Sequence, residues 1–193
     1  MIIERLSIKD GEIYIGISEN QNLNNLDTDS FLLLAKSLSE SVLAFQFFNS
    51  LMIIDDLHLL SAAQNAVNAM NGDYMISRSL DVELIVYASA QRQIGLALDT
   101  MGVVDQLASV TAVCIDEDEK KVRQCLSDVT KGVGEENSPM FNPTPEKITS
   151  LMESFGITDL EMMQFTDEDD LASRTRALSK CIVSRVSQVA LGS

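Results

Sequence analysis

The sequence has little of what several functional classes require. It contains no tryptophan, only 5% aromatic residues, and 14 lysines and arginines against 29 aspartates and glutamates, so its formal net charge is −15. A surface of stacking aromatics, and a uniform attraction to nucleic acid or to an anionic membrane, are therefore disfavoured. Any contact with a polyanion must use a local basic patch. No apolar run approaches the ~20 residues of a membrane span, and no signal sequence opens the chain, so we expect a cytoplasmic protein without membrane contact.

Cysteine and histidine are also scarce. The chain has three widely spaced cysteines, Cys114, Cys125 and Cys181, and the single histidine His58. A zinc site needs four ligands and would have to gather all of these residues from distant positions. We therefore expect no metal site, reduced thiols in or near the core of a cytosolic protein, and a structural role for the histidine.

Catalytic motifs are absent as well. The sequence has no phosphate-binding glycine loop, no GxSxG elbow and no HExxH pair. Four consecutive acidic residues at 116–119 cannot converge on one ion from a helix, so we interpret them as a cap for the helix that follows. These observations predict a protein that is not an enzyme and that needs no cofactor.

The elements that are present predict one mixed α/β domain over residues 1–193. Alternating isoleucines predict two strands within residues 2–17, joined by a turn at Lys9–Gly11, and a polar loop follows at 18–27. Residues 132–145 hold all three prolines and are predicted to be a flexible loop. We expect a small, largely antiparallel sheet of about four strands packed with about six to eight helices. The other predicted elements are helices over 28–47, 56–71, 90–101 and 145–155, strands over 82–87 and 108–115, a helix after 116–119, and a last helix opened by a capping box at 166–169.

Residues 81–102 carry the strongest functional signal. The first half is rich in β-forming residues and predicts a core strand, and Ser89 is placed to cap the helix that follows. Gln91, Arg92 and Gln93 would then lie in the first helical turn, where free amides and a guanidinium suit an anion such as phosphate. The simpler alternative is an ion pair between Arg92 and a nearby carboxylate, and physics alone favours that alternative.

The same region carries a family resemblance. The resemblance rests on four segments: DDLHLLSAAQNAVNAM from Asp55, Ser77–Leu80 with Glu83, YASAQRQIGLALDTMGV from Tyr87, and VTAVCIDEDE from Val110. With these segments the chain resembles the CGI family, which includes the PRPK-binding protein of animals and supplies the kinase-binding subunit of the KEOPS complex. The resemblance covers residues 50–190 well, including Ile157–Leu160 and the terminal helix, and the first strands loosely.

The resemblance implies a subunit without catalytic activity of its own. KEOPS places threonylcarbamoyl on the adenosine next to the anticodon of tRNA, and the chemistry belongs to its other subunits. The CGI-family subunit docks on the N-lobe of an atypical kinase/ATPase and promotes its activity. In archaeal members it also helps to capture the 3′ CCA end of the tRNA. The partners implied are therefore the kinase and, within the complex, the tRNA tail, with no small-molecule substrate.

Binding of the tRNA tail would suit Arg92, because a single-stranded tail offers phosphates and bases together. The net negative charge of the chain predicts weak tRNA binding by the isolated protein. Helix 56–71 and the terminal helix are the candidates for the kinase-facing surface. The alternative function is a small-molecule-binding regulatory domain or enzyme with a pocket between sheet and helices. The residues predicted to bind the tRNA tail are Arg92, Gln93, Ile94, Arg78, Asn68, Tyr87 and Ser89.

Overall fold

A computed structural model describes residues 1–8 and 11–191, and its centre is a four-stranded antiparallel sheet. The order of the strands across the sheet is β1-β2-β4-β3. The predicted mixed α/β class and the small antiparallel sheet are confirmed, while the expected turn at Lys9–Gly11 falls partly outside the described residues. The strands are β1 (Ile2–Ile8), β2 (Gly11–Gln21), β3 (Ala44–Asn49) and β4 (Ser109–Asp116).

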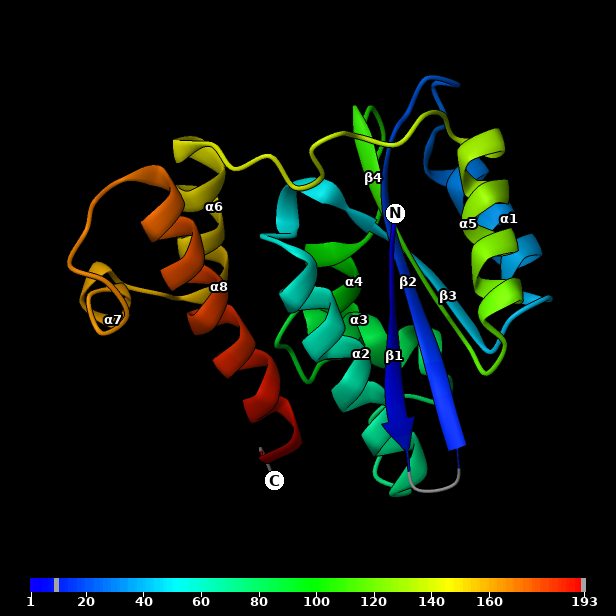
Figure 1. Cartoon of the computed structure of the whole chain (residues 1–193), viewed down its shortest axis with the longest axis horizontal. Helices are drawn as coiled ribbons and strands as arrows, with labels where there is room; N and C mark the ends of the chain where they lie inside the picture. Colours follow the sequence, from blue (N-terminus) through cyan, green and yellow to red (C-terminus); the bar gives the residue numbers. More distant parts are fainter. Residues whose placement is uncertain (9–10, 192–193) are drawn as a thin grey trace.

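Eight α-helices in the described residues cover the two faces of this sheet. In Figure 1, α1 and α5 lie together on one side of the sheet, and the remaining helices lie on the other side. The helices are α1 (Thr28–Ser39), α2 (Asp56–Asn71), α3 (Leu80–Ala88), α4 (Ile94–Met101), α5 (Glu119–Gly132), α6 (Pro145–Phe155), α7 (Asp159–Met162) and α8 (Leu171–Gln188), with short 3-10 turns at Ser50–Met52 and Val189–Leu191.

Strand alternation divides the core into two layers. In β2, Ile13, Ile15 and Ile17 point into the larger cluster, which is shared with α2, α3, α6 and α8. Phe45 and Phe47 of β3 point to the opposite face, into the cluster under α1 and α5. Because successive side chains of a strand face opposite ways, a sheet covered on both faces needs apolar residues at nearly every position.

The predicted strand at 82–87 is wrong: residues Leu80–Ala88 form helix α3. The residues are β-forming, but the segment packs against α2, β3 and α8 and is buried almost all round. A helix enclosed in this way has no polar face, so the period of 3.6 residues that marks a helix does not show in its sequence. The predicted burial of this segment is nevertheless confirmed, since Leu84 to Ala88 are all in the core.

The predicted helix over 28–47 is also wrong in its second half. Helix α1 ends at Ser39, and β3 begins at Ala44, so this edge strand replaces the one expected at 82–87. Leu38, Val42 and Phe45 are spaced as on one helical face, which hid the alternation of Phe45 and Phe47 across the strand. The expected loop at 18–27 is shorter than predicted, because β2 continues to Gln21.

Helix ends agree with the sequence where a capping side chain forms its hydrogen bond in the structure. Helix α2 begins where predicted, after Asp55, whose carboxylate accepts from the His58 amide. Helix α6 also has its predicted bounds, between the Thr144 cap and left-handed Gly156. The capping box predicted at 166–169 is wrong, because Asp170 caps α8. The capping box lies instead at Thr158–Glu161 and starts α7.

The loop after α5 follows the end of β2 closely. Gln21 donates a backbone hydrogen bond to the Glu135 carbonyl at 2.8 Å, and Asn137 donates one to the Glu19 carbonyl at 2.7 Å. The buried Glu19 carboxylate accepts from the Phe141 amide at 2.6 Å. These contacts place the loop along the sheet margin, and its predicted flexibility stays a prediction.

The cysteines are free and buried, as predicted. The neighbouring Cys125 thiol on α5 raises the pKa of the Cys114 thiol on β4 above its usual range, with burial as the second cause. No described helix is long and apolar enough to cross a membrane.

Candidate functional site

The candidate site lies where α3 ends and α4 begins. Helix α3 closes with the Ala90 amide donating to the Tyr87 carbonyl (3.0 Å) and the Gln91 amide to the Val86 carbonyl (3.3 Å). This is the Schellman pattern, and it requires a left-handed residue after the cap, which here is Ala90 with φ of 54°. The chain therefore reverses sharply and presents residues 91–96 at the surface.

Ser89 has a different role from the predicted one. It is the C-cap of α3 rather than the N-cap of α4, and it is buried. Its hydroxyl donates to the Val86 carbonyl at 3.0 Å and accepts from the Gln91 amide at 3.2 Å. The prediction that Ser89 starts the next helix is wrong because the preceding segment is itself a helix and needs an end.

Arg92 is exposed and forms no ion pair within the described part of the chain. Its guanidinium donates instead to the carbonyl of Val189 at 2.6 Å, just after the end of α8. A cation at the carboxyl end of a helix is favourable, because the helix dipole is negative there. The alternative of a carboxylate partner for Arg92 is therefore wrong, and one of its five N–H donors ties α4 to α8.

The start of α4 is open to solvent. Gln93 is the N-cap and makes no side-chain capping bond, so the amides of the first turn have no side-chain acceptor. Gln93, Ile94 and Leu96 are exposed, and the space around Gly95 is empty out to 4 Å from a notional Cβ. Arg92, these amides and the two apolar side chains thus form one accessible surface.

Tyr87 does not belong to that surface. Its side chain is 1% exposed, and burial raises the pKa of its phenol to about 12. Charges of Tyr74, Glu83 and Arg92 act on the same hydroxyl, which places these groups around it. A buried ring has no free face for a nucleotide base, so Tyr87 can position neighbours but cannot stack on a tail.

The segment between α2 and α3 carries the remaining predicted residues. The fully buried Glu83 accepts hydrogen bonds from the amides of Ile76 (3.0 Å) and Ser77 (2.7 Å) and thereby holds this segment against α3. Arg78 is exposed beside this anchor, and Asn68 is exposed on α2, where it accepts from Gln64. Among the described residues, neither contacts Arg92 through a hydrogen bond. The anchoring role of Glu83 had no signal in the sequence, because the amides that donate to it lie in an irregular segment.

His58 is a buried polar group near the amino end of α2. The ring of His58 is fully buried, its Nε2 lies 2.7 Å from the Ala88 carbonyl, and its Nδ1 has no partner. The pKa of His58 is lowered to about 4, chiefly by burial; the hydrogen bond with Ala88 opposes this effect, and the charge of Lys147 adds to it. Asp55 accepts from Ser179, while burial raises the pKa of the Asp55 carboxyl. The predicted structural role of His58 agrees with this packing.

The surface cavities offer no enclosed reaction site. Five cavities of about 340–520 Å³ open at the surface, and the walls of these five contain neither a cysteine nor Arg92. The described residues bring together no group of three or more metal-ligating side chains. The pocket between sheet and helices required by the alternative function is instead filled by the larger core cluster.

The fold defines the class of a mixed α/β protein, and one of its surfaces combines an exposed guanidinium, open helix amides and apolar side chains. A family model described as kinase binding protein CGI-121 matches residues 21–189, and the chain belongs to that family. The resemblance is thereby confirmed, and the family supports a kinase as the partner. No curated protein matches the sequence significantly.

Proposed function

We propose that this chain is the non-catalytic KEOPS subunit that binds and activates the atypical kinase/ATPase. We further propose that it helps to recruit the 3′ CCA end of tRNA for threonylcarbamoylation of the adenosine next to the anticodon. The observation that carries the proposal is the family match over residues 21–189. The buried interior between sheet and helices also favours a binding role over the alternative of a small-molecule site.

The open start of α4 supports tail binding. Arg92 retains four donors beyond the one used by Val189, and the first-turn amides add further donors for phosphate. Ile94 and Leu96 offer apolar contact for a base. Tyr87 and Ser89 leave the proposed contact set because they are buried, and Arg78 and Asn68 stay in it as outer contacts.

We place the proposed kinase-binding surface on α8 rather than on α2. Helix α2 packs against the sheet, α3 and α8, whereas α8 packs mainly against other helices. The carboxyl half of α8 exposes Ser184, Ser187 and Gln188 beside the Arg92 contact. A kinase docked there would lie next to the proposed tail site, so both partners could be held by one end of the molecule.

The test compares two arginine variants in the assembled complex with its kinase. Arg92→Gln is expected to weaken binding of tRNA with an intact CCA end roughly tenfold, the effect of losing one charge-assisted hydrogen bond. Arg123→Gln removes an equal charge from the far side of the sheet, where Arg123 pairs with Glu119, and should leave tRNA affinity unchanged. Affinity is measured by fluorescence anisotropy at fixed salt.

A tRNA lacking CCA separates tail binding from other effects. Both variants should bind this shortened tRNA as the wild type does. An equal loss for Arg92→Gln on intact and shortened tRNA would show that Arg92 acts elsewhere than at the tail. Failure of the wild-type chain to retain the cognate kinase in a pull-down would refute the subunit role itself. Thermal unfolding of Arg92→Gln checks that the lost contact with Val189 has not unfolded the chain.

A further inference from the structure

The short helix α7 and the segment that follows it form an exposed apolar surface on the far side of α8 from the sheet. In Figure 1 this part stands at the edge of the molecule, with α6 and α8 between it and the strands. Leu160 is 75% exposed and Met163 is 62% exposed. Phe165 and Leu171 are partly exposed, at 44% and 39%, and the Lys180 ammonium lies 5.4 Å from the centre of the Phe165 ring. Four large apolar side chains within twelve residues are more than the scattered single exposures of an ordinary surface. We call residues 159–171 the α7 surface.

An open cavity of about 430 Å³ is set into this surface. Met162 and Met163 line it from α7, and Thr166 to Asp169 line it from the connecting segment. Methionine side chains are flexible and polarizable, so they adapt to apolar groups of different shapes. The cavity therefore has the size and lining to receive one apolar side chain of a partner.

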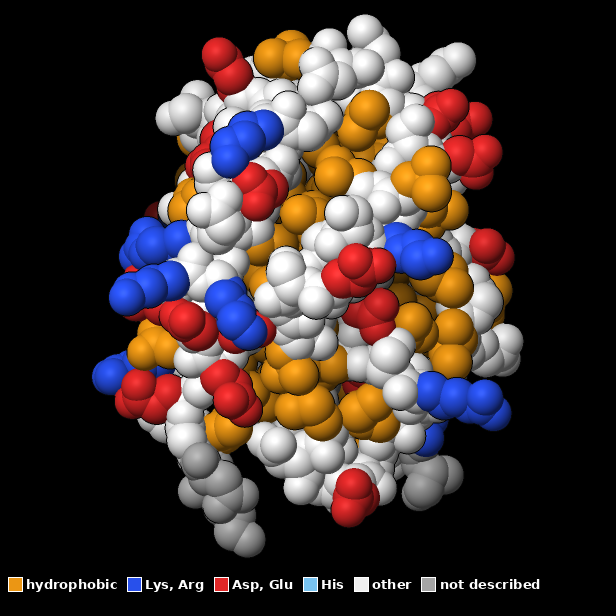
Figure 2. Space-filling view, turned by 90° about the vertical axis from the view of Figure 1, so that its right-hand side faces the viewer, with side chains coloured by type: hydrophobic (Ala, Val, Ile, Leu, Met, Phe, Trp, Pro, Cys, Tyr) orange, Lys and Arg blue, Asp and Glu red, His pale blue; other side chains and the backbone are white. Residues whose placement is uncertain are grey.

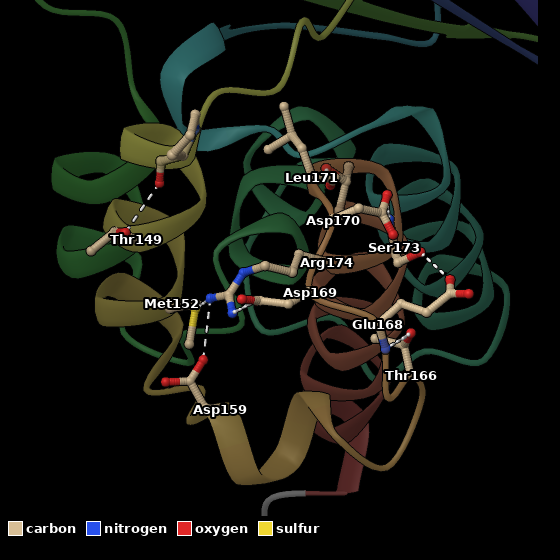
Figure 3. A network of polar contacts seen from close by, with 12 residues as sticks. Thr149, Met152, Asp159, Thr166, Glu168, Asp169, Asp170, Leu171, Ser173 and Arg174 are labelled. Atoms are coloured by element: carbon tan, nitrogen blue, oxygen red, sulfur yellow. Dashed lines mark hydrogen bonds and ion pairs between the residues drawn. The ribbon is translucent and has the colours of Figure 1, made fainter.

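A central arginine holds the walls of the cavity in place. Figure 3 shows Arg174 reaching from α8 between α6 and α7. Its guanidinium contacts Asp159 at 3.2 Å, Asp169 at 3.0 Å and the sulfur of Met152 at 3.7 Å. Glu168 accepts from the Ser173 hydroxyl at 2.7 Å, which ties the segment to α8 a second time. The α7 surface is thus fixed before a partner arrives, which lowers the entropy cost of binding.

The charge of this surface selects the partner. Residues 159–170 contain six carboxylates and no lysine or arginine. Arg174 and Arg185 pair with three of the six, Asp159, Glu161 and Asp169. The other three, Asp167, Glu168 and Asp170, form no ion pair within the described ranges. An apolar surface edged by these three carboxylates complements a segment that carries apolar residues on one face and cations beside them.

We propose that the α7 surface docks a basic amphipathic helix of a protein partner. Its apolar side chains pack on Leu160, Met163 and Phe165, one of them enters the cavity, and its lysines or arginines lie against Asp167–Asp170. The proposal rests on this surface alone and holds whether or not the chain acts in KEOPS. A second apolar area lies at Leu32 and Leu33 of α1. On the side of the molecule where α1 and α5 lie, which faces the viewer in Figure 2, basic and acidic side chains are mixed among the apolar ones, so the charges there specify no occupant.

The probe is a synthetic helix of about 14 residues with leucines on one face and lysines beside them, titrated into the full chain at physiological salt. A matched peptide with glutamates in place of the lysines is the charge control and should not bind. The double variant Leu160→Ser and Met163→Ser is expected to weaken binding of the lysine peptide roughly tenfold, because it removes two apolar contacts. Leu33→Ser, at a leucine that is 71% exposed on α1, should leave the affinity unchanged.

Charge reversal separates local docking from attraction to an acidic protein. Asp167→Lys and Glu117→Lys change the net charge equally, and both residues are exposed. The first should weaken the lysine peptide roughly fivefold more than the second, because only Asp167 borders the cavity. Equal weakening by the two reversals, equal affinity of Leu160→Ser/Met163→Ser and the wild type, or binding of the glutamate peptide would each overturn the proposal. All the substituted residues are exposed, so unchanged thermal unfolding is the folding control.

Discussion

His58 is a titratable residue whose ring is fully buried. Its Nε2 faces the Ala88 carbonyl and must donate to it, so the neutral ring carries its proton there and leaves Nδ1 unpartnered. The folded-state pKa is about 4, against an ordinary value of 6.5. The unfolded chain therefore takes up a proton first as the pH falls. The contribution of neutral His58 to the free energy of unfolding is present above pH 6.5, and about 3 kcal/mol of it is lost as the pH falls from 6.5 to 4.

The other charges around His58 affect the size of this loss. The charge of Lys147 on α6 also acts to lower the pKa of His58. Burial raises the pKa of Asp55. Protonating Asp55 therefore favours the folded state and partly offsets the loss of stability. Because His58 is the only histidine, His58→Gln removes the titration and keeps a donor for Ala88. Denaturant unfolding from pH 7 to 4 should show a smaller loss for this variant. Parallel curves for the two proteins would contradict the assignment.

At the scale of elements, the contact of α5 with β2 depends on Gly16. A Cβ at this position would lie 2.4 Å from Val122 Cγ1 and 2.8 Å from Leu126 Cδ1, closer than carbon atoms approach. Gly16→Ala is therefore expected to push α5 away from the sheet and to lower the free energy of unfolding by about 1–3 kcal/mol. Denaturant titration measures the change.

Gly95 is the matched control for that substitution. It lies inside α4 with empty space around it, so Gly95→Ala meets no atom and adds helix propensity. This variant should gain up to about 1 kcal/mol of stability. The two alanines thus have opposite expected signs, and a loss of stability at both positions would show that contact with α5 is not the cause.

The whole molecule carries a net charge of −15, which opposes its proposed contact with tRNA. The candidate surface offers only two arginines, Arg92 and Arg78, to phosphate. For a single-stranded tail, each neutralised phosphate contributes a slope of about −0.7 in log affinity against log salt. We expect the isolated chain to bind a CCA-ended oligonucleotide weakly, with a slope no steeper than about −1.4. Titrations between low and physiological salt measure it, and a slope beyond about −3 would reveal a basic surface larger than the one described.

Prediction from sequence succeeded where the signal is local. The ends of α2 and α6 depend on Asp55, Thr144 and Gly156, which act within one helical turn. Prediction failed for α3 because it is enclosed by other elements and shows no helical period. It failed for β3 because the helical spacing of Leu38, Val42 and Phe45 hid the alternation of the strand. At the candidate site, the exposure of Arg92, Gln93 and Ile94 agrees with the prediction, whereas Tyr87 and Ser89 became core residues once their segment folded as a helix.

The sequence by itself determined the family, the mixed α/β class, the antiparallel sheet and the helices with strong caps, since composition and short-range hydrogen bonding suffice for these. Only the tertiary structure decided that residues 80–88 are helical and that 44–49 form the edge strand. It also decided that Arg92 meets the end of α8 rather than a carboxylate. The physical reason is common to these cases. Burial and long-range contacts outweigh intrinsic propensity, and they join residues as far apart as 92 and 189, whose proximity depends on the packing of α3, α4 and α8.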